Sequence, residues 1–134
     1  MLVRDRMSPH PVTLRSDADY KAALMLMQDH ALHHVPVLDT GSRLVGIVTE
    51  RDVLLAATRH LQAAMEVGDV MHRNVTTARP EMPIAEAAAL MVEHRIGGLP
   101  VVDGDERVIG VITESDIFRA FVERERKRDA TAGA

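Results

Sequence analysis

The chain has 134 residues, enough to bury a hydrophobic core, and its net charge of −4 leaves no basic surface for DNA over the chain as a whole. It contains no cysteine, which excludes disulfides, cysteine-based zinc sites and thiol catalysis. Only 2% of the residues are aromatic, which disfavours stacking on single-stranded nucleic acid. The sequence shows neither a signal peptide nor a stretch apolar enough to span a bilayer. We therefore expect a cytoplasmic protein with no membrane or nucleic-acid partner.

The first elements along the chain are a short turn, a strand and a helix. The turn is predicted at 3–7 and the strand at 12–14. A helix is predicted over 17–30, where apolar residues recur at helical spacing. The segment Ser16-Asp17-Ala18-Asp19 precedes this helix and is typical of an N-terminal capping box. His30 is expected to end the helix, where an imidazole interacts favourably with the helix dipole.

Two strands and a second helix are predicted next. Aliphatic residues at 35–38 favour a strand, and the apolar run at 44–48 predicts another strand, buried on both faces. A helix is predicted over 52–64, and Thr49-x-x-Asp52 resembles a capping box with Asp in place of the usual Glu. We expect its buried face to carry four apolar residues: Val53, Leu54, Ala57 and Leu61.

The same pattern occurs a second time along the chain. An offset of 64 positions relates four pairs of residues: Pro36 and Pro100, Gly46 and Gly110, Thr49 and Thr113, and Asp52 and Asp116. A period of this length that occurs only twice indicates a duplicated supersecondary unit rather than a solenoid. The strands and helices of one copy cannot bury their own apolar faces, whereas two copies packed together can.

The second copy predicts elements at positions that match the first. A strand is expected at 75–77, a helix over 83–94 and a last helix that begins near Glu114. The chain is therefore divided into three predicted segments: a first repeat with its linker helix at 1–66, a second repeat at 67–123, and a charged, flexible C-terminal tail at 124–134.

The doubled signature h-P-h-h-D … G-h-h-T-x-x-D, in which h is an aliphatic residue, resembles the CBS domain, here as a tandem pair (a Bateman module). The resemblance covers about residues 3–122. It implies an α/β fold of duplicated β-α-β-β-α units packed as a pseudo-twofold pair, with clefts between the repeats that commonly bind adenosine-containing ligands. It also implies a regulatory protein without catalysis of its own, and two modules of this family commonly form a disk-like homodimer.

The resemblance further implies which residues bind the ligand. Asp52 and Asp116 would accept hydrogen bonds from ribose hydroxyls. The residues expected near ribose or phosphate are Thr49, Thr113, Arg51 and Ser115, and those expected to line the cleft before each proline are Leu32, His33, His34, Ile96, Gly97 and Gly98. The segments expected to pack on the base are Val12-Thr13 and Asn74-Val75-Thr76. In the family, one cleft would pair Asp116 with His33-His34, and the other would pair Asp52 with Ile96-Gly97.

Other interpretations of these residues stay open. The Thr and Asp residues of the signature are also explained as helix caps, and His33 and His34 as exposed polar residues at the start of a strand. A metal site is not expected, because His30, His33 and His34 lack a carboxylate at ligand spacing. Asp52 and Asp116 are related by the repeat, whereas acid–base catalysis needs two carboxylates in unlike environments.

These observations together predict a stand-alone sensor without a catalytic site or a resident cofactor. Its expected ligand is AMP, ADP, ATP, S-adenosylmethionine or NAD, and ligand binding is expected to act on a partner protein that the sequence does not name. The alternative is a structural or dimerisation module with no physiological nucleotide. In either case a homodimer is expected.

Overall fold

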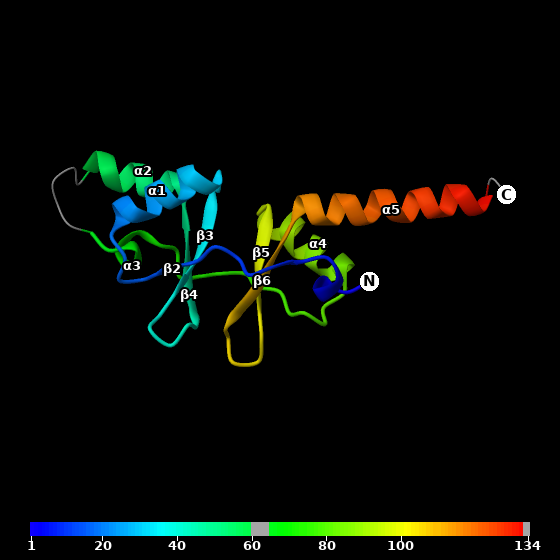
Figure 1. Cartoon of the computed structure of the whole chain (residues 1–134), viewed down its shortest axis with the longest axis horizontal. Coiled ribbons are helices and arrows are strands. Elements are labelled where there is room, and N and C mark those ends of the chain that lie inside the picture. Colours follow the sequence, from blue (N-terminus) through cyan, green and yellow to red (C-terminus); the bar gives the residue numbers. More distant parts are fainter. Residues whose placement is uncertain (60–64, 133–134) are drawn as a thin grey trace. The chain divides into compact units, whose positions relative to one another are not determined.

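The computed structural model describes residues 1–59 and 65–132, which form two compact units (Figure 1). We call the unit made of residues 12–75 and 104–108 the Asp52 unit. The unit made of residues 1–11, 76–103 and 109–134 is called the Asp116 unit. Each is described by itself below.

The Asp52 unit is a three-stranded sheet covered by helices. Its elements are β2 (Leu14–Arg15), α1 (Tyr20–His30), β3 (His34–Leu38), β4 (Leu44–Thr49), α2 (Glu50–Arg59) and α3 (Val67–Val70). Strand β3 pairs in parallel with β2 and antiparallel with β4, and α1 lies beside α2 (Figure 1). Its core consists of small and aliphatic residues with one tyrosine: Tyr20, Ala23, Met27, Val35, Val37, Val48, Val53, Ala56 and Val67.

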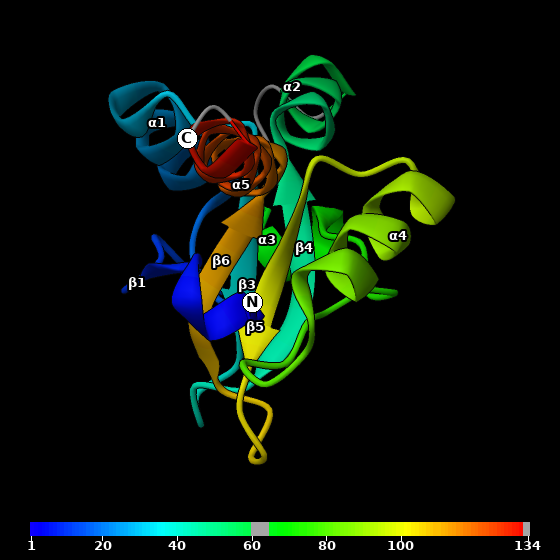
Figure 2. The ribbon, with the colours of Figure 1, turned by 90° about the vertical axis from the view of Figure 1, so that its right-hand side faces the viewer.

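The Asp116 unit repeats this architecture. Its elements are a 3₁₀ turn (Val3–Asp5), β1 (Ser8–Pro9), α4 (Ile84–His94), β5 (Gly98–Val102), β6 (Val108–Thr113) and α5 (Glu114–Ala132). The strand order is β1-β6-β5, and Figure 2 shows α4 on the side of β5. The core of this unit is again aliphatic: Val3, Ala78, Ala87, Met91, Leu99, Val101 and Ile112. The predicted α/β fold of duplicated β-α-β-β-α units is therefore confirmed.

Each sheet is completed by a segment from the other repeat. Strand β1 belongs to the first repeat but pairs antiparallel with β6 of the second. In the Asp52 unit, Ile47 N–H donates to the carbonyl of His72 at 2.9 Å, and His72 N–H donates to the carbonyl of Ile47 at 2.8 Å. We call residues 7–9 and 71–73 the crossing segments. This exchange of segments between the repeats was not predicted from the sequence.

The predicted strands differ from the observed ones in position and in burial. Strand β2 begins at Leu14, and its counterpart in the second repeat is a single bridge between Ala78 and Val101, so both lie slightly later than predicted. Strand β4 was expected to be buried on both faces, but only its alternate residues, Gly46 and Val48, are buried. This alternation is the normal consequence of successive side chains pointing to opposite faces of a sheet.

Two helix predictions also need correction. Helix α1 begins at Tyr20 because the side chain of Asp19 caps it, accepting a hydrogen bond from Lys21 N–H at 2.8 Å. Leu54 lies on the exposed side of α2, whereas Val53 and Ala56 are buried; Leu61 falls outside the described residues.

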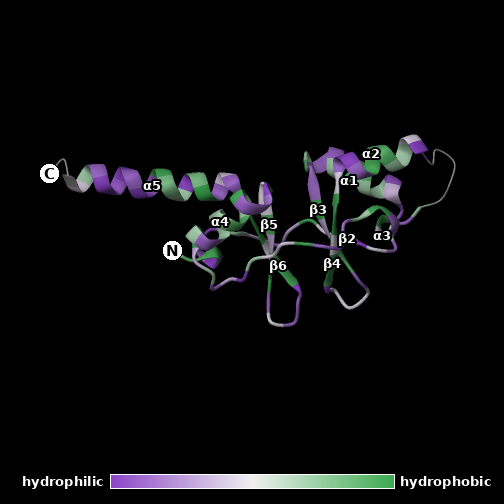
Figure 3. Cartoon of the chain, turned by 180° about the vertical axis from the view of Figure 1, so that it is seen from behind, coloured by the Kyte–Doolittle hydropathy of each residue, from purple (hydrophilic) through white to green (hydrophobic). Residues whose placement is uncertain are grey.

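The C-terminal segment is helical rather than a flexible tail. Helix α5 continues from Glu114 to Ala132 and so includes most of the segment that was predicted to be a flexible tail. Its Arg, Glu, Lys and Ala residues have high helix propensity, and Arg6 forms an ion pair with Glu123 partway along the helix. Figure 3 shows hydrophobic residues in the first half of α5 and polar residues beyond them.

The glycines of the signature allow the crossing segments to approach the sheets. A Cβ atom added at Gly46 would lie 2.7 Å from the carbonyl oxygen of His72, and one at Gly110 would lie 2.9 Å from that of Ser8. Both positions therefore require glycine, since the atom in the way belongs to backbone. By contrast, a Cβ atom at Gly104 would meet nothing within 4 Å.

We predict that Gly46→Ala and Gly110→Ala each lower the free energy of unfolding by roughly 1–3 kcal/mol, because the added methyl group displaces a crossing segment. Urea unfolding followed by circular dichroism measures this. Gly104→Ala is the matched control and should change stability by less than about 0.5 kcal/mol. Equal stability of all three variants would contradict the close approach.

Candidate functional site

Asp52 lies in the first turn of α2 and forms a reciprocal cap with Thr49. The N–H of Thr49 donates to Oδ2 of Asp52 at 3.0 Å, and the Thr49 hydroxyl donates to the same oxygen at 2.6 Å. The N–H of Asp52 in turn donates to Oγ1 of Thr49 at 3.1 Å. This is the capping box that the sequence predicted. It occupies Oδ2 and so leaves Oδ1 for another partner.

The other oxygen of Asp52 faces a histidine of the crossing segment. Nε2 of His72 lies 2.9 Å from Oδ1 of Asp52, within hydrogen-bond distance. The Asp52 side chain is largely buried, with 17% exposed, whereas the His72 side chain is 61% exposed. The imidazole can therefore move into solvent at low cost, while the carboxylate is held in place.

Asp116 occupies the equivalent position in the other unit. The N–H and the hydroxyl of Thr113 donate to its Oδ2 at 2.8 and 3.1 Å. Its Oδ1 accepts a hydrogen bond from Nη2 of Arg119, one turn further along α5, at 2.8 Å. The Asp116 side chain is only 7% exposed, whereas that of Arg119 is 68% exposed. Both units therefore hold a fixed carboxylate behind an exposed basic side chain.

The residues before each proline lie next to the start of the following helix. The N–H of Glu50 donates to the carbonyl of His33 at 3.0 Å, and the N–H of Glu114 donates to the carbonyl of Gly97 at 2.9 Å. In both units, the structure thus brings the predicted pre-proline residues close to the Thr and Asp residues of the signature.

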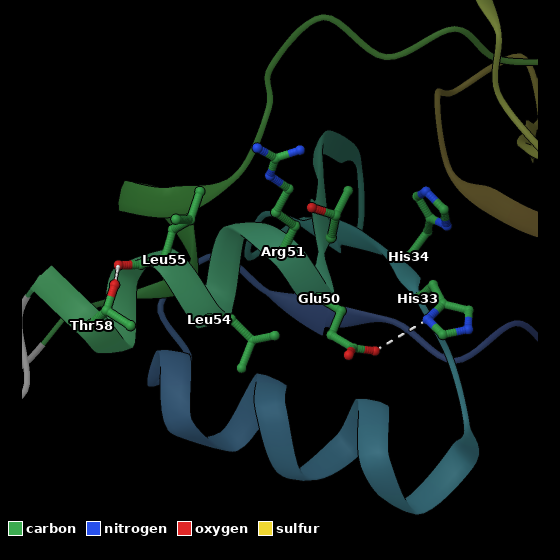
Figure 4. A pocket seen from close by; sticks show the side chains of 8 residues that line it. His33, His34, Glu50, Arg51, Leu54, Leu55 and Thr58 are labelled. Carbon is green, nitrogen blue, oxygen red and sulfur yellow. Dashed lines mark hydrogen bonds and ion pairs between the residues drawn. The ribbon is translucent and has the colours of Figure 1, made fainter.

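His33 and His34 are directed to different sides, although they are neighbours in sequence. Nδ1 of His33 lies 3.1 Å from Oε2 of Glu50. Figure 4 shows this pair on the side nearer α1, whereas His34 and Arg51 project on the opposite side. The structure therefore groups His34 with Arg51 and separates His33 from both. All four residues line a groove of about 480 Å³, together with Thr49, Leu54, Leu55 and Thr58.

The imidazole of His34 has a lowered pKa. Partial desolvation is the main cause, the neighbouring His33 adds to the shift, and the negative charge of Asp52 opposes it. The Asp52 carboxylate is therefore close enough to His34 for its charge to be felt there.

The Asp116 unit has a second groove, and its polar lining differs. The groove lies between α4 and α5 and is lined by Ala88, Met91, Val92, Arg95, Ile96, Glu114, Ile117 and Phe118. A Cβ atom at Gly97 would lie 3.2 Å from Oε1 of Glu114, so this carboxylate lies over the glycine backbone. Gly98 begins β5, where the first repeat has His34.

The remaining predicted residues are not tested by these contacts. Leu32 packs against the core of the Asp52 unit. The segments predicted to pack on an adenine base, Val12-Thr13 and Asn74-Val75-Thr76, lie in the chain where it passes from one unit to the other. Their contact with a base stays a prediction, as does the pairing of Asp116 with His33-His34 and of Asp52 with Ile96-Gly97.

Two residues of the site were not found from the sequence. His72 reaches Asp52 only because the crossing segment pairs with β4, and no local pattern predicts that pairing. The contact of Arg119 with Asp116 could have been predicted, because residues three apart on a helix are neighbours.

Within residues 1–59 and 65–132, no three His, Asp or Glu side chains are arranged to hold a metal ion.

The repeated sheets, the capped carboxylates and the pre-proline segments define a CBS-type repeat. The CBS domain family matches residues 3–59 and 67–123, and the chain therefore belongs to this family as a tandem CBS domain pair.

Two solved structures resemble the chain over nearly its whole length. The CBS domain pair of protein MJ0100, in complex with 5′-methylthioadenosine and S-adenosylmethionine, is 34% identical with a TM-score of 0.81, covering 92% of this chain and 98% of that one. An acetoin utilization protein (AcuB) from Vibrio cholerae is 34% identical with a TM-score of 0.84, covering 97% and 96%.

Related proteins differ greatly in length. A CBS domain-containing protein of Dictyostelium discoideum is 32% identical, and the match covers 91% of this chain and 92% of the relative. L-aspartate semialdehyde sulfurtransferase of Methanocaldococcus jannaschii is 35% identical over 120 residues, but these cover 90% of this chain and only 23% of the enzyme. The chain thus spans about a quarter of the length of such enzymes.

No helix within residues 1–59 and 65–132 is long and apolar enough to cross a membrane.

We predict that His34 makes the protein less stable as the pH falls. Because the pKa of His34 is lowered in the folded state, the unfolded chain binds its proton at a higher pH, near 6.5. The free energy of unfolding should therefore decrease as the pH drops through this value, and His34→Gln should remove that part of the decrease. Urea unfolding at pH 7.5 and 5.5 measures it, and superimposable profiles of variant and wild type would contradict the assignment.

Proposed function

We propose that this CBS pair is a regulatory module in which Asp52 and Asp116 hold the ribose of an adenosine-containing ligand. The observation that carries the proposal is that the two oxygens of each carboxylate have different partners. Oδ2 is fixed by the helix cap, while Oδ1 faces only a side chain that is largely exposed. A vicinal diol can displace that side chain and donate to Oδ1 without disturbing the helix.

The solved structures support this ligand class. The CBS pair of MJ0100 was crystallised with 5′-methylthioadenosine and S-adenosylmethionine. CBSX2, 29% identical with a TM-score of 0.83, was crystallised with AMP. These ligands share adenosine and differ at the 5′ position, so we propose that the adenosine moiety is the common recognition element.

The proposed role is regulatory rather than catalytic. The enzymes among the relatives are about four times as long as the matched segment, so the similarity is to their CBS portion. Ligand binding would favour one arrangement of the module over another and change its contact with a partner protein. Such an effect requires that the ligand bind the two arrangements with different affinity.

A second copy of the chain is proposed to cover exposed apolar side chains of the helices. In the Asp116 unit, Val92 is 79% exposed, Phe118 65% and Phe121 60%, and Val122 lies beside them. In the Asp52 unit, Met25, Leu54 and Leu55 are exposed. Residues 118, 121 and 122 share one face of α5, and apolar side chains gathered in this way mark an interaction surface. The same surface would serve a module that dimerises without any nucleotide, so ligand binding discriminates the two functions.

We predict that an adenosine-containing ligand stabilises the protein through the two aspartates. At about 100 times its dissociation constant, a ligand should raise the free energy of unfolding by about 2.7 kcal/mol. Thermal unfolding with AMP, ATP, S-adenosylmethionine and 5′-methylthioadenosine tests this. Asp52→Asn or Asp116→Asn should remove the shift for the ligand bound at that position, since Asn retains the cap but loses the charge.

The matched control is Asp29→Asn, which changes an exposed carboxylate at the end of α1 and should leave the ligand shift intact. If no adenosine-containing ligand shifts the unfolding of the wild type, the module does not have this function, and dimerisation alone becomes the better account.

We also predict that Phe118→Asp and Phe121→Asp convert a dimer to a monomer, because each places a charge in the apolar contact. Sedimentation velocity measures the change in mass. Arg128→Ser, exposed further along the same helix, is the control and should leave the mass unchanged. A wild type that sediments as a monomer at all concentrations would show that the apolar surface does not join two copies.

A further inference from the structure

The side chains around the two carboxylates differ in charge, although the backbone geometry is the same. The 64-residue offset relates three basic residues around Asp52 to three small neutral residues around Asp116: His34 to Gly98, Arg51 to Ser115 and His72 to Ser8. The correspondence of His72 and Ser8 is structural as well, because His72 pairs with Ile47 as Ser8 pairs with Val111.

Around Asp52, the three basic side chains come from three different parts of the unit: β3, α2 and the crossing segment. His72 Nε2 lies 2.9 Å from Oδ1 of Asp52, and Asp52 is among the groups that set the pKa of His34. Arg51 projects on the same side as His34 in Figure 4. It is exposed, and no carboxylate of the described residues lies within ion-pair distance of it.

The second acidic side chain near this site, that of Glu50, is turned away from Arg51. Glu50 is paired with His33 on the side of the groove away from Arg51 (Figure 4). The charge of Arg51 therefore stays available to a ligand held at Asp52. A guanidinium with free N–H groups and two neighbouring imidazoles are the donors that proteins use for a phosphate group.

Around Asp116, the neighbouring side chains are different. Glu114 lies over the backbone of Gly97 and, within the described residues, has no histidine or other cation within ion-pair distance. Arg119 is engaged with Oδ1 of Asp116 itself. The glycine and the two serines at the equivalent positions supply neither a guanidinium nor an imidazole donor. A phosphate dianion would be repelled here, whereas a neutral thioether or a positively charged sulfonium would not.

We infer that the two sites of this chain select different adenosine ligands: the Asp52 site takes one with a 5′-phosphate, recognised by His34, Arg51 and His72, and the Asp116 site takes one without a phosphate. This inference rests on the proposed function, because it assumes that both aspartates bind ribose. It groups His34 with Asp52 of the same unit, in place of the predicted pairing of His33-His34 with Asp116. His72 has two roles in this inference. Its ring lies against Oδ1 of Asp52, the oxygen proposed to bind ribose, and it supplies a hydrogen-bond donor beside that oxygen.

Isothermal titration calorimetry of the whole chain tests the inference, with AMP, adenosine, 5′-methylthioadenosine, S-adenosylmethionine and inorganic phosphate as separate ligands. For the double variant Arg51→Ser with His72→Ser, the AMP affinity should fall at least about tenfold, because charge-assisted hydrogen bonds are lost. Binding of 5′-methylthioadenosine should be unchanged. Both residues are exposed, so the variant should fold; Arg59→Ser at the other end of α2 is the matched control.

A reciprocal variant tests the same idea by gain of binding. Ser115→Arg with Ser8→His, made in an Asp52→Asn background, should bind AMP, whereas Asp52→Asn alone should not.

Two results would overturn the inference while leaving the proposed function intact. One is unchanged AMP affinity in the variant Arg51→Ser with His72→Ser, and the other is loss of AMP binding in Asp116→Asn rather than in Asp52→Asn. Inorganic phosphate binding as tightly as AMP would also overturn it, since adenosine would then contribute nothing. A wild type that binds no adenosine ligand would overturn both.

Discussion

The close approach of a crossing segment to a glycine is the constraint on which the rest of this structure depends. At Gly46 the carbonyl of His72 comes so near that even a methyl group would not fit, and Gly110 receives Ser8 in the same way. This approach extends each sheet with backbone from the other repeat, so each sheet contains residues that are distant in the chain. It also delivers a side chain of the crossing segment to the capped aspartate, as His72 shows.

The helix cap couples stability to ligand chemistry. A capping carboxylate normally serves only to satisfy backbone N–H groups at the start of a helix. Here one oxygen does this in both units, and the geometry of the cap then fixes where the second oxygen points. The protein therefore obtains an oriented acceptor from an interaction that it needs for folding, and no separate scaffold is required to hold it.

How far the sequence predicted this structure depended on whether the interactions were local. The caps at Thr49 and Thr113 and the helix that ends at His30 follow from neighbouring residues, and they were predicted. The contact of His72 with Asp52 was not, because it depends on strand pairing between distant parts of the chain. His33 and His34 were treated as one pair, although successive residues at the start of a strand point to opposite faces. The length of α5 was missed because charge was taken as a sign of disorder.

Duplication explains why the two sites share a backbone and differ in charge. The residues that both repeats retain, glycine, threonine and aspartate, are those whose replacement would disturb the sheet or the helix cap. The positions that differ, such as 51 and 115, are exposed, and substitutions there cost the fold little. Ligand preference can therefore diverge without a penalty in stability. We propose that a module built in this way compares two adenosine ligands rather than measuring one, because each site would respond to a different 5′ group.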